Sequence, residues 1–115
     1  MDTEFWSRLD ELLAAHELVI DRPRGTAHPR YPDLIFPLDY GYLAGTTGGD
    51  GQGIDVWHGS AGHEELMAIV GTVDMKKRDA ELKLLIGCTD EELDIIERFH
   101  NGRYQSAIVV KRPAR

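Results

Sequence analysis

Residues 36–56 read FPLDYGYLAGTTGGDGQGIDV, an aromatic stretch that passes through a glycine-rich turn into a predicted strand. Five of the nine residues from Gly45 to Gly53 are glycine, so this turn can adopt backbone conformations that other residues avoid. Asp50 and Asp55 flank the end of the turn. Carboxylates on a turn that a rigid strand supports can hold a hard divalent cation. The same pattern also fits a polar hairpin loop whose aspartates only cap turns.

The composition of the 115-residue chain predicts one domain, residues 1–115, with a single core. Twenty acidic residues against thirteen lysines and arginines give a net charge of −7, which disfavours a nucleic-acid partner because phosphate binding needs a basic face. The one cysteine, Cys88, excludes an internal disulfide and a thiolate zinc cluster and fits a reducing compartment. No apolar run approaches ~18 residues and the first residues are acidic, so we expect a cytoplasmic protein with no membrane partner.

Hydrophobic periodicity predicts two helices and about six short strands. A helix is expected over residues 3–16, where Phe5 and Leu9 recur at helical spacing, and Thr89 with Glu92 forms a capping-box pattern that starts a second helix. Alternating or β-branched segments predict strands over residues 18–21, 54–58, 65–74, 80–86 and 105–110. Residues 34–43 predict an aromatic strand or a strand pair that Pro37 breaks. The predicted fold class is therefore α+β, a small, mostly antiparallel barrel with an N-terminal and a late C-terminal covering helix.

A locally basic loop follows the first predicted strand. Residues 22–31 contain Arg22, Arg24, Arg30 and His28 together with two prolines, inside an otherwise acidic protein. These charges fit an ordinary solvated loop. They also fit an anion-binding edge, provided that the loop faces Asp50 and Asp55.

The glycine-rich turn and its flanks resemble the soluble inorganic pyrophosphatases of the first family. Those enzymes carry a Pro-x-Asn-Tyr-Gly-Tyr segment, to which Tyr40-Gly41-Tyr42 is similar, followed by an Asp-Gly-Asp-Pro-hydrophobic-Asp signature, to which residues 50–55 are similar. Further similar segments occur in the same order at Ile20–Pro23, Val70-Gly71, Met75, Glu81–Lys83 and Glu97–Asn101. The resemblance implies an OB-like five-stranded barrel with its site at one mouth.

The resemblance also implies roles for individual residues. It places Mg²⁺ ligands at Asp50, Asp55, Glu81 and Asp21. Catalytic positions fall on Asp55, Tyr40 and Gln52; the family has a water-activating aspartate where this chain has Gln52, and glutamine can orient a water but cannot take its proton. Substrate-binding positions fall on Arg30, Lys83, Lys77 and His100, and Lys77 reverses the charge of a family aspartate.

Two functions of different classes follow from this resemblance. The first is a magnesium-dependent hydrolase of a phosphoanhydride, with inorganic pyrophosphate as the default small substrate. Because Gln52 replaces the water-activating carboxylate, this enzyme would either turn over slowly or act on an organic diphosphate. The second is a non-catalytic regulatory module that keeps a metal and phosphate site, which Gln52 and Lys77 favour. A purely structural role for the aspartates is the third interpretation. Members of the family commonly assemble, so the resemblance leaves a homo-oligomer open.

Overall fold

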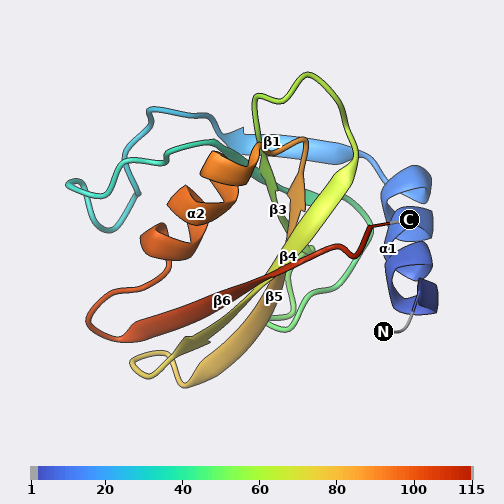
Figure 1. The fold of residues 1–115 in the computed structure, drawn as a ribbon. Helices are drawn as coiled ribbons and strands as arrows, with labels where there is room; N and C mark the ends of the chain where they lie inside the picture. Colours follow the sequence, from blue (N-terminus) through green and yellow to red (C-terminus); the bar gives the residue numbers. More distant parts are fainter. Residues whose placement is uncertain (1–2, 115) are drawn as a thin grey trace.

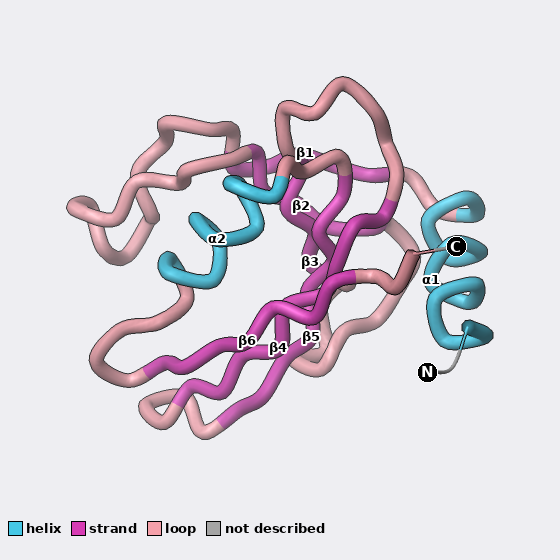
Figure 2. Tube along the Cα trace, in the orientation of Figure 1, coloured by secondary structure: helices cyan, strands magenta, loops and turns pink. Residues whose placement is uncertain are grey.

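The computed structural model describes residues 3–114, which form two helices and one six-stranded mixed sheet (Figures 1 and 2). In chain order the elements are α1 (Thr3–Ala15), β1 (Leu18–Arg22), β2 (Asp39–Leu43), β3 (Asp55–His58), β4 (Leu66–Asp74), β5 (Asp79–Ile86), α2 (Asp90–Phe99) and β6 (Gln105–Lys111). These elements confirm the predicted α+β class and both covering helices.

The strands lie in the order β1-β2-β3-β5-β4-β6. Every pairing is antiparallel except that of β3 with β5, which is parallel. Strands β1 and β6 lie at the two edges, and no ladder joins them within residues 3–114, so the sheet is open and a closed barrel is not shown. The predicted mostly antiparallel pairing is confirmed, within a mixed sheet.

The two helices cover opposite faces of the sheet. Trp6 of α1 is buried in a cluster with Val56, whereas Trp57, the next residue of β3, belongs to a second cluster that includes Leu93 of α2. Successive side chains of a strand point to opposite faces, so the two clusters lie on the two sides of the sheet. Figure 1 shows α1 at the right and α2 at the left of the strands. No helix in the described part of the chain is long and apolar enough to cross a membrane.

Helix α2 starts as its sequence predicts. The Thr89 side chain accepts a hydrogen bond from the Glu92 backbone N–H, and the Glu92 carboxylate accepts one from the Thr89 N–H. Glu92 also accepts from the N–H and hydroxyl of Ser60, which ties the loop after β3 to the start of the helix.

The aromatic segment at 34–43 forms less strand than expected. Strand β2 begins only at Asp39, and Ile35 makes an isolated bridge to Ala27. Pro37 explains the break because it has no backbone N–H to donate to a ladder. Within β2, a side chain at Gly41 would collide with the backbone of Val19, so glycine is required where β1 and β2 approach closely.

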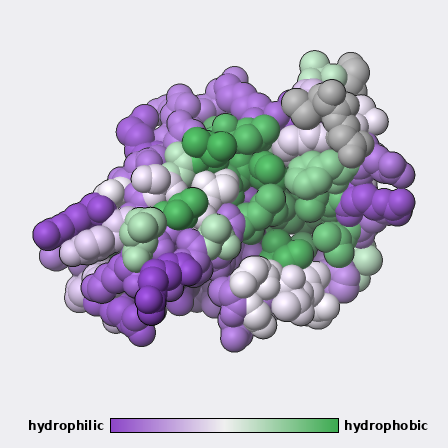
Figure 3. Space-filling model, turned by 90° about the horizontal axis from the view of Figure 1, so that it is seen from below, coloured by the Kyte–Doolittle hydropathy of each residue, from purple (hydrophilic) through white to green (hydrophobic). Residues whose placement is uncertain are grey.

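The sheet leaves part of its outer face uncovered. Val73, Leu82 and Ile108 lie on the face of β4, β5 and β6 that also carries Gly71, and all three side chains are exposed. Figure 3, which views the molecule from below, shows apolar residues gathered in one patch on this side of the molecule. Glu81 and Lys83, the neighbours of Leu82, lie on the opposite face of β5.

Candidate metal and phosphate site

The parallel pairing of β3 with β5 positions the predicted ligands. Val56 lies opposite Leu84 in this ladder, so the preceding residues, Asp55 and Lys83, lie side by side on the other face of the sheet. Glu81 precedes Lys83 by two residues and therefore shares its face. Asp50 reaches the same place from the glycine-rich turn between β2 and β3.

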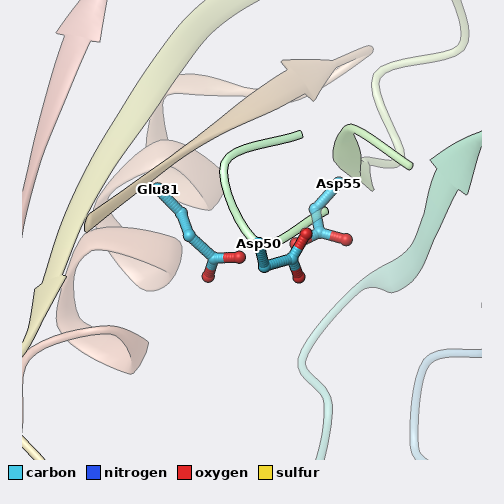
Figure 4. A group of neighbouring side chains, drawn as sticks. All are labelled: Asp50, Asp55 and Glu81. Atoms are coloured by element: carbon cyan, nitrogen blue, oxygen red, sulfur yellow. The ribbon is translucent and has the colours of Figure 1, made fainter. Parts of the chain in front are cut away.

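The structure brings three of the four predicted metal ligands together. Asp50, Asp55 and Glu81 each offer a carboxylate oxygen, and these oxygens all lie within 4.8 Å of one another. Figure 4 shows the Asp50 carboxylate between those of Glu81 and Asp55. Asp21, the fourth, lies on β1 and lines the small pocket around the cluster, which has a volume of about 470 Å³, but it lies outside this group.

The environments of the carboxylates differ. The backbone N–H of Gln52 donates to Asp50 Oδ1 at 2.9 Å, and this hydrogen bond is the main cause that lowers the pKa of Asp50. Burial raises the pKa of Glu81, and its interaction with the Asp50 carboxylate adds to the increase. Burial therefore disfavours the ionised form of Glu81, and a cation bound beside the carboxylates would stabilise their negative charge.

Lys83 supplies one such cation from within the protein. Its side chain is buried, and Nζ donates to Asp55 Oδ2 at 2.8 Å, to Tyr40 Oη at 2.9 Å and to Glu81 Oε2 at 3.3 Å. Burial alone would lower the pKa of Lys83, but Tyr40 and Asp55 outweigh it and raise the pKa. Burial is also the main cause that raises the pKa of Tyr40, so its hydroxyl stays protonated.

The donor set of the cluster fits Mg²⁺. All three groups are carboxylates, and Mg²⁺ prefers a few carboxylate oxygens together with water and substrate phosphates. One ammonium against three carboxylates leaves negative charge for a divalent ion to neutralise. Asp50, Asp55 and Glu81 would hold the ion, while Gln52 and Tyr40 line the same small pocket.

A second, larger cleft adjoins the cluster. Its volume is about 1000 Å³, and it shares Arg22, Tyr40, Lys77, Glu81 and Lys83 with the small pocket. Six of the thirteen lysines and arginines of the chain line this cleft: Arg22, Arg30, Lys76, Lys77, Lys83 and Arg103. The acidic lining groups are Asp74 and Glu81. The cleft is thus basic in a protein whose net charge is −7.

The basic loop at residues 22–31 forms one wall of this cleft. Arg22, His28 and Arg30 all line it, and Arg22 and Asp21 also line the small pocket that contains Asp50 and Asp55. Arg22 therefore faces Asp50 and Asp55, as an anion-binding edge requires, whereas Arg24 lines neither cavity. Arg30 and Lys77, both predicted to bind substrate, lie in the same cleft.

His100, the remaining predicted substrate ligand, lines the cleft as a neutral group. Trp57 Nε1–H donates to His100 Nε2 at 3.0 Å, so the ring proton is on Nδ1, which contacts Gln105 Oε1 at 2.9 Å. Burial lowers the pKa of His100 to about 4. The imidazole is therefore uncharged at neutral pH, and both of its nitrogens have protein partners.

Sequence reasoning missed several lining residues. Lys76, Arg103, Tyr104 and Trp57 all line the large cleft, although the motifs at residues 36–56 gave no reason to connect them with Asp50. Arg103 and Tyr104 follow helix α2, far along the chain from the glycine-rich turn. The signal that could have found them is a second basic and aromatic loop in an acidic chain.

No family model, curated protein or solved structure matches this chain.

Proposed function

We propose that the protein is a magnesium-dependent hydrolase of a phosphoanhydride, with inorganic pyrophosphate as the simplest substrate. The observation that carries this proposal is the position of the carboxylate cluster. Asp50, Asp55 and Glu81 open into a small pocket that is continuous, through Lys77 and Lys83, with a cleft lined by cations. Oxygen ligands for a cation beside an anion-binding cleft are the parts that phosphoryl transfer needs.

The reaction would be an in-line displacement. A water oxygen forms a bond to one phosphorus, the bond from that phosphorus to the bridging oxygen breaks, and the second phosphate leaves with the bridging oxygen. Mg²⁺, when bound, would neutralise the phosphoryl oxygens and lower the pKa of the attacking water. Lys77 would bind phosphoryl oxygens as a point charge, and Lys83 keeps Asp55 and Glu81 in place through its hydrogen bonds.

Gln52 limits the expected rate. Its side chain is exposed in the small pocket, where an amide can orient a water but cannot accept its proton at neutral pH. We therefore expect slow turnover. The variant Gln52→Asp places a carboxylate at this position and is expected to raise the phosphate release rate by about 10²-fold, the lower end of general-base effects.

The resemblance to the first family of soluble inorganic pyrophosphatases belongs to this proposal. The Tyr-Gly-Tyr segment on β2, the turn carrying Asp50 and the lysine at position 83 support it because they meet at one site. An OB-like relationship is also proposed. The order of the first five strands, with β3 parallel to β5, supports a partly open Greek-key barrel of this type.

The test is phosphate release from pyrophosphate in the presence of Mg²⁺. Asp50→Asn is the sharpest variant because asparagine can still accept the Gln52 N–H bond, so the turn is kept while the charge is lost. Asp55→Asn removes a ligand that also pairs with Lys83, so its folding must be checked by circular dichroism. The exposed Asp94→Asn on α2 is the matched control. Equal rates in wild type, Asp50→Asn and Asp55→Asn would refute catalysis at this site.

A non-catalytic metal and phosphate module is the second candidate function. Gln52 favours it because this side chain cannot accept a proton where the resemblance implies a carboxylate. Lys77 favours it because this cation lines the small pocket where the resemblance implies an aspartate. Calorimetry with Mg²⁺ and methylenediphosphonate separates the two functions. Binding that is lost in Asp50→Asn, without phosphate release by the wild type, would support the module.

A further inference from the structure

The large cleft offers more space than an inorganic diphosphate requires. Its volume of about 1000 Å³ lies at the upper end of the range for small-molecule sites, roughly 300–1,000 Å³. The carboxylate cluster lies in the small pocket at one side of it, and Tyr31 and Tyr104 line only the large cleft. A ligand that reaches from the carboxylates into the large cleft therefore has a second part beyond its phosphates.

Five of the six cations that line the cleft, all except Lys83, have no carboxylate partner in the described part of the chain and are available to such a ligand. The side chains of Arg22, Arg30, Lys76, Lys77 and Arg103 make no ion pair or hydrogen bond within residues 3–114. Outside the cleft, Arg8, Lys111 and Arg112 pair with carboxylates, whereas Arg24, Arg78 and Arg98 are unpaired as well among the described residues. Unpaired cations gathered in one cleft of an acidic protein indicate a site for an anion with several charges.

His28 lies in the cleft among cations that come from different segments of the chain. Its Nδ1 accepts the backbone N–H groups of Arg30 and Tyr31, which fixes the loop at the mouth of the cleft. Burial lowers the pKa of His28, and the positive charges of Arg22, Lys77 and Arg30 lower it further. Arg22 of β1, Lys77 of the β4–β5 turn and Arg30 of the loop line the same cleft as His28.

Aromatic rings complete the cleft. Tyr31 and Tyr104 line it, and these residues are 47% and 48% exposed. Arg103 Cζ lies 5.3 Å and Lys76 Nζ 5.6 Å from the centre of the Tyr104 ring. Exposed rings beside cations are the arrangement that binds nucleotides, because bases stack on aromatic faces while phosphates pair with the charges.

We propose that the substrate of this site is a nucleoside diphosphate, with its base against Tyr31 and Tyr104, its phosphates along Arg22 and Lys77, and its terminal phosphate at the carboxylate cluster. This inference rests on the proposed hydrolase function. A water oxygen bonds to the terminal phosphorus, the bond from that phosphorus to the bridging oxygen breaks, and the bridging oxygen leaves with the nucleoside monophosphate. The products are a nucleoside monophosphate, phosphate and one proton.

The test compares two non-hydrolysable probes, α,β-methylene-ADP and methylenediphosphonate, by calorimetry with Mg²⁺. They share the P–C–P group and differ in the adenosine. The wild type is expected to bind the nucleotide probe about tenfold more tightly. Tyr31→Ala and Tyr104→Ala should each weaken the nucleotide probe by about five- to tenfold and leave methylenediphosphonate unchanged, since stacking is lost and the phosphate contacts stay.

Phe5→Ala, an exposed aromatic residue on α1 outside the cleft lining, is the matched control and should change neither probe. Equal affinity of the wild type for both probes, or equal weakening of both by the tyrosine variants, would overturn the inference. Displacement of the nucleotide probe by a short oligouridylate at lower concentration than ADP would overturn it in favour of a nucleic-acid strand.

Hydrolysis assays with pyrophosphate and ADP test the nucleotide inference and the proposed hydrolase function independently of each other. Rapid phosphate release from pyrophosphate without preference for the nucleotide probe would leave the hydrolase proposal standing and overturn the nucleotide inference. A tenfold preference for the nucleotide probe, lost in Tyr104→Ala, without phosphate release from either compound, would refute the hydrolase proposal and support the cleft as a nucleotide-binding site.

Discussion

Replacing Lys83 by methionine removes the ammonium group that lies among Asp55, Glu81 and Tyr40. The side chains of Lys83 and Asp55 are only 5% and 19% exposed, so the ion pair is largely shielded from water. Removing one partner of a buried pair typically lowers the free energy of unfolding by about 3–5 kcal/mol, because it leaves uncompensated charge in the interior. Here two carboxylates, Asp55 and Glu81, lose their partner at once.

The assay is urea unfolding in the presence of EDTA, with Lys111→Met as the matched control. Lys111 pairs with Asp90 at 3.6 Å, but these side chains are 61% and 85% exposed, so this variant should lose at most about 1 kcal/mol. Repeating both measurements with Mg²⁺ at a hundredfold its Kd should add about 2.7 kcal/mol to the wild type. It should add more to Lys83→Met, because the competing ammonium is gone. A loss in Lys83→Met no larger than that in Lys111→Met would refute the reasoning.

Burial lowers the pKa of His100 from 6.5 to about 4. As the pH falls, the imidazole is therefore protonated in the unfolded chain before it is protonated in the folded protein. The free energy of unfolding should decrease by about 3 kcal/mol between pH 7 and pH 4. His100→Gln should remove that slope from urea midpoints, and parallel pH profiles would contradict it. Burial alone would raise the pKa of Glu92, but hydrogen bonds from Thr89 and Ser60 outweigh it and lower the pKa. The Glu92 carboxylate should therefore stabilise the fold above pH 4.5, and this contribution should be lost as the pH falls through the lowered pKa of the folded protein. Glu92→Gln should therefore cost about 1–2 kcal/mol at pH 7 and progressively less in acid, and an equal loss at pH 3 and pH 7 would contradict this. The Thr72 hydroxyl is buried without a hydrogen-bond partner among the described residues, so Thr72→Val should raise the free energy of unfolding by about 1 kcal/mol, and a lower thermal midpoint would contradict this.

Local patterns in the sequence predicted most of the secondary structure. The capping box at Thr89 and the alternation from Asp55 to His58 depend on neighbours in the chain, and the structure contains both. The segment at 34–43 was predicted as a strand or a strand pair broken by Pro37. The part after the break forms β2, whereas the part before it makes only an isolated bridge at Ile35. The closure of a barrel depends on contacts between distant edges, which periodicity does not report.

The site was predictable only in part. Asp50 and Asp55 are close in sequence, so their proximity follows from one turn, and Glu81 was connected to them through the family resemblance. The hydrogen bonds of Lys83 to Asp55 and Tyr40 require the parallel register of β3 and β5, which a single sequence does not specify because β4 intervenes. The cleft was missed for the same reason: Tyr31, Lys77 and Tyr104 come from three loops that only the tertiary fold brings together.

The parallel contact between β3 and β5 also has a consequence for folding kinetics. Strands β2 and β3 form one antiparallel pair and β4 and β5 another, each joined by a single connection along the chain. Either hairpin can form from contacts between nearby residues, whereas docking them requires a non-local parallel pairing. Asp50 and Asp55 belong to the first hairpin and Glu81 to the second, so the repulsion between Glu81 and the two aspartates arises only at docking. The carboxylates of the proposed metal site therefore oppose the docking of the two hairpins during folding. Lys83, which lies on the second hairpin, offsets this repulsion through its ion pairs with Asp55 and Glu81.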